Sequence, residues 1–229
     1  MKIKPLGIAL LIFWMISFCY LFAYRVASDS LLLPGDGVLS LDFLTTLEKE
    51  VIRELNLART NPSKYAEFIE DFKRHYAGKY IYLPGQTQIA TNEGVDAVNE
   101  AIRFLRNCTP LPLLRVSKGL SLAARDHVND QGPVGLTGHN GKDNSTPETR
   151  ISRFGTWGVA YAENIEYGNF AAREIVMQLI IDDGVSNRGH RANIFKSNFT
   201  LIGVNCGPHN SYGQMCVMDF AGSYREKKL

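Results

Sequence analysis

Cysteine is scarce in this chain, with four among 229 residues. A scaffold held together mainly by disulfides needs a much denser set, so that class of protein is excluded. Three signatures of metal-binding or nucleophilic chemistry are also missing, because the sequence contains no H-E-x-x-H, no C-x-x-C and no G-x-S-x-G. The sequence therefore names no reaction and assigns no catalytic residue.

An excess of one charge is also missing outside the N-terminal segment. Residues 1–28 hold three basic and no acidic residues, which leaves 22 bases against 23 acids in the remainder. A domain so close to neutral gives no electrostatic reason to expect nucleic acid or an anionic membrane as a partner. We predict no nucleic-acid binding, and membrane contact only where the N-terminal segment is retained.

The N-terminal segment has the pattern of an export signal. Lys2 and Lys4 precede an almost unbroken apolar run over residues 6–24, and the small residues Ala27 and Ser28 follow. This order is typical of a secretory signal peptide. The run is also long enough to span a bilayer, so an uncleaved signal anchor is the alternative. We expect a secreted, extracellular protein, or one anchored in the membrane by residues 6–24.

The rest of the chain predicts one domain. We expect a signal peptide or anchor over 1–28, an irregular lead-in over 29–40, a single domain over 41–223 and a charged tail over 224–229. Helical periodicity dominates the first half and strands appear in the second, which favours an α+β fold with an antiparallel sheet covered by helices. The predicted elements are helices near 44–58 (with Ser40 as N-cap), 62–72, 91–105, 117–128, 147–155 and 170–181, a strand over 159–167, a helical turn over 189–195, and a hairpin of 200–206 with 214–221; residues 77–90 and 131–146 read as loops.

Two of the cysteines are placed to form a bond with each other. Cys206 and Cys216 flank the turn-forming stretch 207–213, which lies between two β-rich runs. An exported chain enters an oxidising compartment, so a cross-strand disulfide is expected. The alternative is a pair of buried free thiols. Cys108 is left without a partner.

Two histidines lie in segments of the kind that display functional side chains. His139 is in the glycine-rich segment 131–146, and His190 is in the charged stretch 186–191. Glu163 lies in a predicted strand on the same face as apolar neighbours, where a charge must be paired or coordinated; the alternative is a solvated edge position. The acids Asp182 and Asp183 end the helix before His190. Histidines with carboxylates suit a zinc site and acid–base chemistry equally well.

Several ordered motifs resemble those of one known family. They are the segments 55–62, 113–128, 138–141, 162–165, 189–191 and 217–221, whose sequences include GHNG, AENI and GHR. In this order they resemble the CAP superfamily of cysteine-rich secretory proteins, antigen 5 and pathogenesis-related proteins, in its bacterial and protist branch. The likeness covers roughly residues 45–222.

The resemblance implies a three-layer α-β-α sandwich with a small antiparallel sheet, export from the cytoplasm, and a cleft with two histidines and two acids. Divalent metal binding is reported in the family, as is binding of sterols or other lipids, and no single enzymatic activity is accepted for it. His139 and His190 match the two histidines, which would be the ligands of zinc or another divalent metal, and Glu163 matches one acid. The second is normally a glutamate, and here Asp182 or Asp183 would take its place.

Our first hypothesis is therefore a secreted binding module whose cleft holds a metal or small ligand, or recruits an extracellular partner. A metal-dependent hydrolase that uses the same cleft is one alternative, and a carrier of lipid or sterol is another. A third is that the histidines and acids only brace the cleft.

Overall fold

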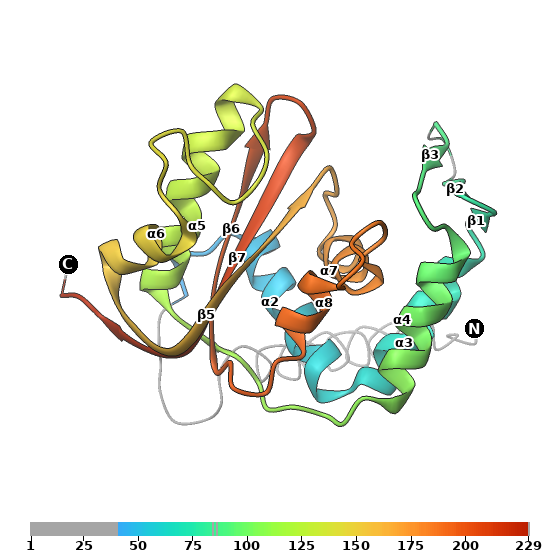
Figure 1. Cartoon of the computed structure of the whole chain (residues 1–229), viewed down its shortest axis with the longest axis horizontal. Helices are drawn as coiled ribbons and strands as arrows, with labels where there is room; N and C mark the ends of the chain where they lie inside the picture. The colour runs from blue at the N-terminus through green and yellow to red at the C-terminus, as the bar shows by residue number, and fades with distance from the viewer. Residues whose placement is uncertain (1–40, 84, 86, 229) are drawn as a thin grey trace, which may run out of the picture.

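The computed structural model describes residues 41–83, 85 and 87–228, and in this part of the chain a four-stranded sheet lies between two layers of helices (Figure 1). The predicted α+β class and α-β-α sandwich are therefore confirmed. The predicted export segment and lead-in, residues 1–40, lie outside the described residues, as does Leu229.

The sheet is antiparallel except at one edge. Its strands lie in the order β4 (Arg115–Val116), β6 (Leu201–His209), β7 (Gly213–Glu226) and β5 (Gly155–Tyr167). The predicted hairpin is β6 with β7, and β5 pairs antiparallel with β7, whereas the short β4 runs parallel to β6. Because β5 pairs only with β7 among the described strands, it is an edge strand.

One face of the sheet is covered by α5 (Lys118–Gln131), the 3₁₀ turn η1 (Gly132–Val134) and α6 (Pro147–Phe154). The N-caps follow from the sequence: the Ser117 hydroxyl accepts from the Leu120 amide, and Thr146 caps the helix that begins at Pro147. Apolar side chains on this side, including Leu120, Ile151 and Ala221, form a core of their own.

The other face carries α2 (Thr46–Thr60), α7 (Ala172–Ile181) and α8 (Gly189–Ile194), with α3 (Pro62–Lys73) and α4 (Val95–Asn107) packed outside them (Figure 1). The larger core lies here. Helix α2 begins later than predicted: Thr45, not Ser40, is its N-cap, and Glu48 completes a capping box by accepting from the Thr45 amide at 2.6 Å. A hydroxyl followed three residues later by a glutamate is the stronger start signal.

Buried Arg59 of α2 ties this helix layer to the chain around α8. Its guanidinium donates to the carbonyl oxygens of Pro112, Ile194, Lys196 and Phe199, over 2.6 to 3.2 Å. Burial lowers the pKa of Arg59 to about 10, which leaves it charged at neutral pH. The end of α8 is thereby fixed against α2.

Three segments differ from their predicted structure. The predicted loop 77–90 contains a small antiparallel sheet of β1 (Tyr76–Ala77), β2 (Tyr80–Ile81) and β3 (Ile89–Ala90). Strand β5 starts at Gly155 and contains an irregularity between Gly158 and Tyr161, where Val159 has a φ of 72°. Strand β7 pairs with β5 as far as Glu226, so residues 224–226 of the predicted charged tail belong to the sheet.

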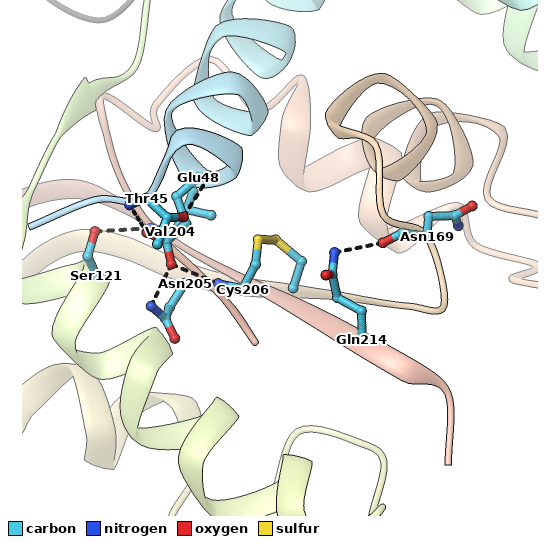
Figure 2. The surroundings of a disulfide bond; sticks show 9 residues. Thr45, Glu48, Ser121, Asn169, Val204, Asn205, Cys206 and Gln214 are labelled. Atoms are coloured by element: carbon cyan, nitrogen blue, oxygen red, sulfur yellow. Dashed lines mark hydrogen bonds between the residues drawn. A yellow bond between two sulfur atoms is a disulfide. The ribbon is translucent and has the colours of Figure 1, made fainter. Parts of the chain in front are cut away.

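The disulfide between Cys206 and Cys216 joins β6 to β7 at facing positions (Figure 2). The prediction of a cross-strand bond is confirmed, and the free-thiol alternative is wrong. Glu48 joins α2 to β6 at the same position. Its carboxylate accepts from the Cys206 amide at 3.0 Å and from the Asn205 side chain at 2.6 Å. Cys108 is a free cysteine.

Within residues 41–83, 85 and 87–228, no helix has the length and apolar character needed to cross a membrane.

Candidate functional site

The segment that carries His139 is attached to the sheet and to α5 by hydrogen bonds on either side of the histidine. The Gly138 amide donates to the Tyr167 hydroxyl at 3.0 Å, and Nε2 of His127 donates to the Gly138 carbonyl at 2.9 Å. Gly138 has a φ of 100°, a conformation that favours glycine. His127 is fully buried, and its burial lowers its pKa. These bonds fix the backbone next to His139.

His139, Glu163 and Arg150 form one connected group. Nδ1 of His139 donates to Oε1 of Glu163 at 2.8 Å, and the Arg150 guanidinium donates to Oε2 of Glu163 at 2.7 Å and to the His139 carbonyl at 2.9 Å. The side chain of His139 is 51% exposed, whereas those of Glu163 and Arg150 are both 1% exposed. The carboxylate is therefore paired from both sides, and Nε2 is the ring nitrogen of His139 left for a ligand.

A second pair is formed by His190 and Asp182. Nδ1 of His190 donates to Oδ1 of Asp182 at 2.7 Å, while Oδ2 accepts from the backbone amides of His190 at 2.9 Å and Arg191 at 3.2 Å. Asp182 is the C-cap of α7 in the left-handed conformation, with a φ of 58°. Aspartate tolerates that conformation better than most residues, so one residue both ends α7 and orients the start of α8.

Asp183 does not belong to this pair. Its carboxylate accepts from the amides of Asn92 at 2.6 Å and Glu93 at 2.7 Å, in the segment before α4. Of the two acids predicted as alternatives, Asp182 is the one whose carboxylate contacts His190, and the carboxylate of Asp183 contacts the segment before α4.

The arginines that flank His190 hold the backbone around it. Arg191 donates to the carbonyl oxygens of Ile180 at 2.6 Å and Ile181 at 3.0 Å, at the end of α7. Arg188 donates to the carbonyl of Asp182 at 2.8 Å and forms ion pairs with Glu93 and Glu100. These contacts hold the pKa of both glutamates near 2, well below their usual value, so both remain charged above that pH.

The two histidine–carboxylate pairs are attached to opposite faces of β5. Successive residues of a strand point to opposite sides. Glu163 meets Arg150 of α6 on one side, and its neighbour Asn164 donates to the His190 carbonyl at 3.0 Å on the other. The Asn164 oxygen in turn accepts from Asn193 of α8 at 2.9 Å.

This arrangement fits a divalent metal only in part. Each histidine uses Nδ1 on a carboxylate and keeps Nε2, which is the usual orientation of an imidazole metal ligand. However, among the described residues no three side chains of histidine, cysteine, aspartate or glutamate are grouped so that they could hold a metal ion. A site held by three protein ligands does not fit these residues. Metal binding by His139 and His190 stays a prediction of the family resemblance.

A hollow of about 420 Å³ lies beside the second pair, lined by His190 and Asp182, by the end of β5 around Glu166 and Tyr167, and by Ile81 and Ile89 of the small sheet. Another hollow of about 420 Å³ lies between η1 and the end of β6, and neither His139 nor His190 lines it. Of the predicted cleft residues, Asp182, Asp183 and His190 line the first hollow, whereas His139 and Glu163 line neither hollow.

Three buried charged residues at or near the site were not predicted. Arg150 reads in sequence as an ordinary surface residue of a short helix. Asp219 faces Glu163 across β5 and β7, is fully buried, and has no hydrogen-bond partner for either oxygen in the described residues. Burial first, and then the Glu163 charge, raises the pKa of Asp219 well above its usual value. The sequence signal that could have identified Asp219 is an acid within the apolar run 215–221. Glu166 is the third buried charged residue, and its sequence signal is similar.

The comparisons with known proteins agree with this fold. The family model described as the cysteine-rich secretory protein family, CAP, matches residues 95–220. Since this match covers more than half of the chain, the protein belongs to the CAP family, as the resemblance predicted.

Two solved structures are similar to the chain at low identity. An outer surface protein from Borrelia burgdorferi is 16% identical with a TM-score of 0.40, over 51% of this chain and 80% of that one. An extracellular protein from Bacillus anthracis that contains an SCP domain is 22% identical with a TM-score of 0.38, over 54% of this chain and 38% of that one. The curated proteins contain no match.

Proposed function

We propose that this protein is an exported CAP-domain binding module that takes a small ligand in the hollow beside His190. The observation that supports the proposal is the lining of that hollow. Side chains from three separate parts of the fold converge there: His190 and Asp182 from the α7–α8 region, the end of β5, and the small sheet β1–β3. An open hollow of several hundred cubic ångströms with apolar walls and a few polar groups is the usual form of a small-molecule site.

Export is supported by independent features. The N-terminal pattern is that of a signal peptide, and a disulfide joins Cys206 to Cys216, a bond that persists in oxidising compartments. The family is named for secretory proteins. The orientation of His190 and Asp182 by hydrogen bonds to several backbone groups gives a rigid polar end to the hollow, which favours recognition of a ligand without a large ordering cost.

The proposal is tested by NMR on the ¹⁵N-labelled protein with three matched amphiphiles: octylammonium, octanol and octanoate. At least one of them is expected to shift the backbone amides of residues 165–169, 178–185 and 190 in a saturable manner. Two exposed alanines of the small sheet supply the control pair. Ala90 lines the hollow and Ala77 does not, so Ala90→Trp is expected to abolish the shifts and Ala77→Trp to preserve them. The absence of saturable shifts with all three compounds would refute the proposal.

A further inference from the structure

The walls of the hollow beside His190 have an unbalanced charge. Three carboxylate residues line it, Glu166, Asp182 and Asp183, and no lysine or arginine does. Arg188 forms ion pairs with Glu93 and Glu100, and Arg191 with Glu100, and none of these four residues is part of the lining. The field inside the hollow therefore favours a cation over an anion.

Glu166 differs from the other two acids because one of its oxygens is unsatisfied. Asp182 and Asp183 use both carboxylate oxygens on amides or on His190. The Oε1 atom of Glu166 accepts from the Asn169 side chain, but Oε2 is buried and has no hydrogen-bond partner among the described residues. The residue is only 6% exposed. A buried acceptor without a partner is costly, and a ligand that donates a hydrogen bond to it removes that cost.

The remaining walls are apolar. Ile81 and Ile89 approach from the small sheet, and Leu179 and Val185 from α7 and the segment after it. These side chains suit the hydrocarbon body of a ligand, because burying apolar surface is favourable in proportion to the area removed from water. A charged headgroup alone would leave these walls exposed to water.

We propose that this hollow binds small amphiphilic primary amines, with the ammonium group at the Glu166 carboxylate and the apolar body between Ile81, Ile89 and Leu179. The inference rests on the proposed function and names its ligand class. A primary ammonium supplies both the positive charge and the N–H donor that Oε2 of Glu166 lacks. Octanol has a donor without a full charge, and octanoate has the opposite charge.

Calorimetric titration of octylammonium into matched variants at pH 8.5, where the Glu166 carboxyl is charged, tests the assignment. Glu166→Gln preserves the shape of the side chain and removes its charge, so octylammonium affinity is expected to fall more than tenfold. Glu67→Gln makes the same change at an exposed position of α3 outside the hollow and is expected to leave the affinity unchanged. Octanol is expected to bind at least tenfold more weakly than octylammonium, and octanoate more weakly still.

Equal affinity of Glu166→Gln and the unaltered protein for octylammonium would overturn the amine assignment, as would octanoate or octanol binding as tightly as octylammonium. In the second case the proposed function would still stand, because a ligand would occupy the hollow. Failure of all three amphiphiles to bind overturns both proposals. Should Glu166→Gln fail to fold, Ala90→Trp provides the second test: octylammonium that binds to Ala90→Trp as tightly as to Ala77→Trp contradicts the assignment.

Discussion

Asp182 holds His190 through both carboxylate oxygens, one on the imidazole Nδ1 at 2.7 Å and the other on the backbone amide of the same residue at 2.9 Å. The carboxylate thus fixes the ring and the backbone of His190 together. Asp182 is also the residue at which α7 ends, so the orientation of the histidine depends on where that helix terminates.

We predict that Asp182→Asn destabilises the protein by about 2 kcal/mol, because a buried carboxylate that accepts from several donors is replaced by a group that cannot satisfy them all. Asp183→Asn is the matched control. Asp183 is partly exposed and accepts from amides of another segment that water can also satisfy, so about 1 kcal/mol or less is expected. Urea unfolding measures both. An equal or greater loss in Asp183→Asn would contradict the separate roles of the two acids.

The Arg150–Glu163 pair is buried, so removal of one partner leaves an uncompensated charge. Arg150→Met is expected to destabilise the fold by about 3 to 5 kcal/mol. The double variant Arg150→Met/Glu163→Met is expected to recover more than half of that loss, because no unpaired charge from the pair then remains.

Arg153→Met is the control for this pair. Arg153 lies on the same helix and forms exposed ion pairs with Asp126 and Asp143, so its loss is expected to cost about 1 kcal/mol or less. Chemical denaturation of the unaltered protein, Arg150→Met, Glu163→Met and the double variant gives the coupling energy, with Arg153→Met measured beside them. A double variant that is less stable than Arg150→Met would show that the pair is not the cause.

The stability of the protein is expected to depend on pH through Glu166. Burial raises the pKa of this carboxyl from 4.5 to about 7 in the folded state. A raised pKa means that the folded state favours the protonated form. The corresponding stability is fully present below pH 4.5 and is lost as the pH rises to 7, by about 3 kcal/mol in total.

Comparison with Glu166→Gln isolates this effect from the other groups around it, namely Glu174, Tyr167, Asp182, Asp183 and His190. The unfolding free energy of the unaltered protein should fall relative to that of the variant between pH 4.5 and 7, and the difference should be constant above pH 8. Urea unfolding across pH 4 to 9 measures the difference. Parallel curves for the two proteins would contradict the raised pKa.

The disulfide closes a short loop, with a separation of 10 residues between Cys206 and Cys216. The entropy of closing such a loop predicts that Cys206→Ser/Cys216→Ser loses about 2 to 3 kcal/mol. Cys108→Ser is expected to change the stability by less than about 0.5 kcal/mol, since Cys108 makes no disulfide. Unfolding under non-reducing conditions provides the measurement, and equal losses in the two variants would contradict the assignment.

The fold was predictable from the sequence to a large extent, since most helices have both a start signal and a regular apolar face. The exceptions have physical causes. The apolar run after Ser40 predicts Ser40 as the first N-cap, but the Thr45–Glu48 capping box is a reciprocal interaction and decides where α2 begins. The strands β1 to β3 have two residues each, too few to show a period of two.

His139, His190 and Glu163 were predictable as candidates because their motifs lie in segments with recognisable neighbours, but the structure does not bring them to one hollow: His190 lines it, and His139 and Glu163 do not. The choice between Asp182 and Asp183 was not predictable from the sequence, because it depends on which residue adopts the left-handed conformation at the end of α7. Arg150 was missed because a charged residue in a short helix reads as exposed. Its partner Glu163 lies 13 positions further along the chain, beyond the reach of a local pattern.

Two adjacent residues of the edge strand β5 bind the two histidine segments. Glu163 binds His139 on one face, and Asn164 binds the His190 carbonyl on the other. This makes the site sensitive to chain length in a way that composition does not reveal. Deleting Ala162 would move each later side chain of the strand to the opposite face, so a single codon lost there would separate both contacts at once. Insertions and deletions should therefore be excluded from residues 161–164 in any functional relative.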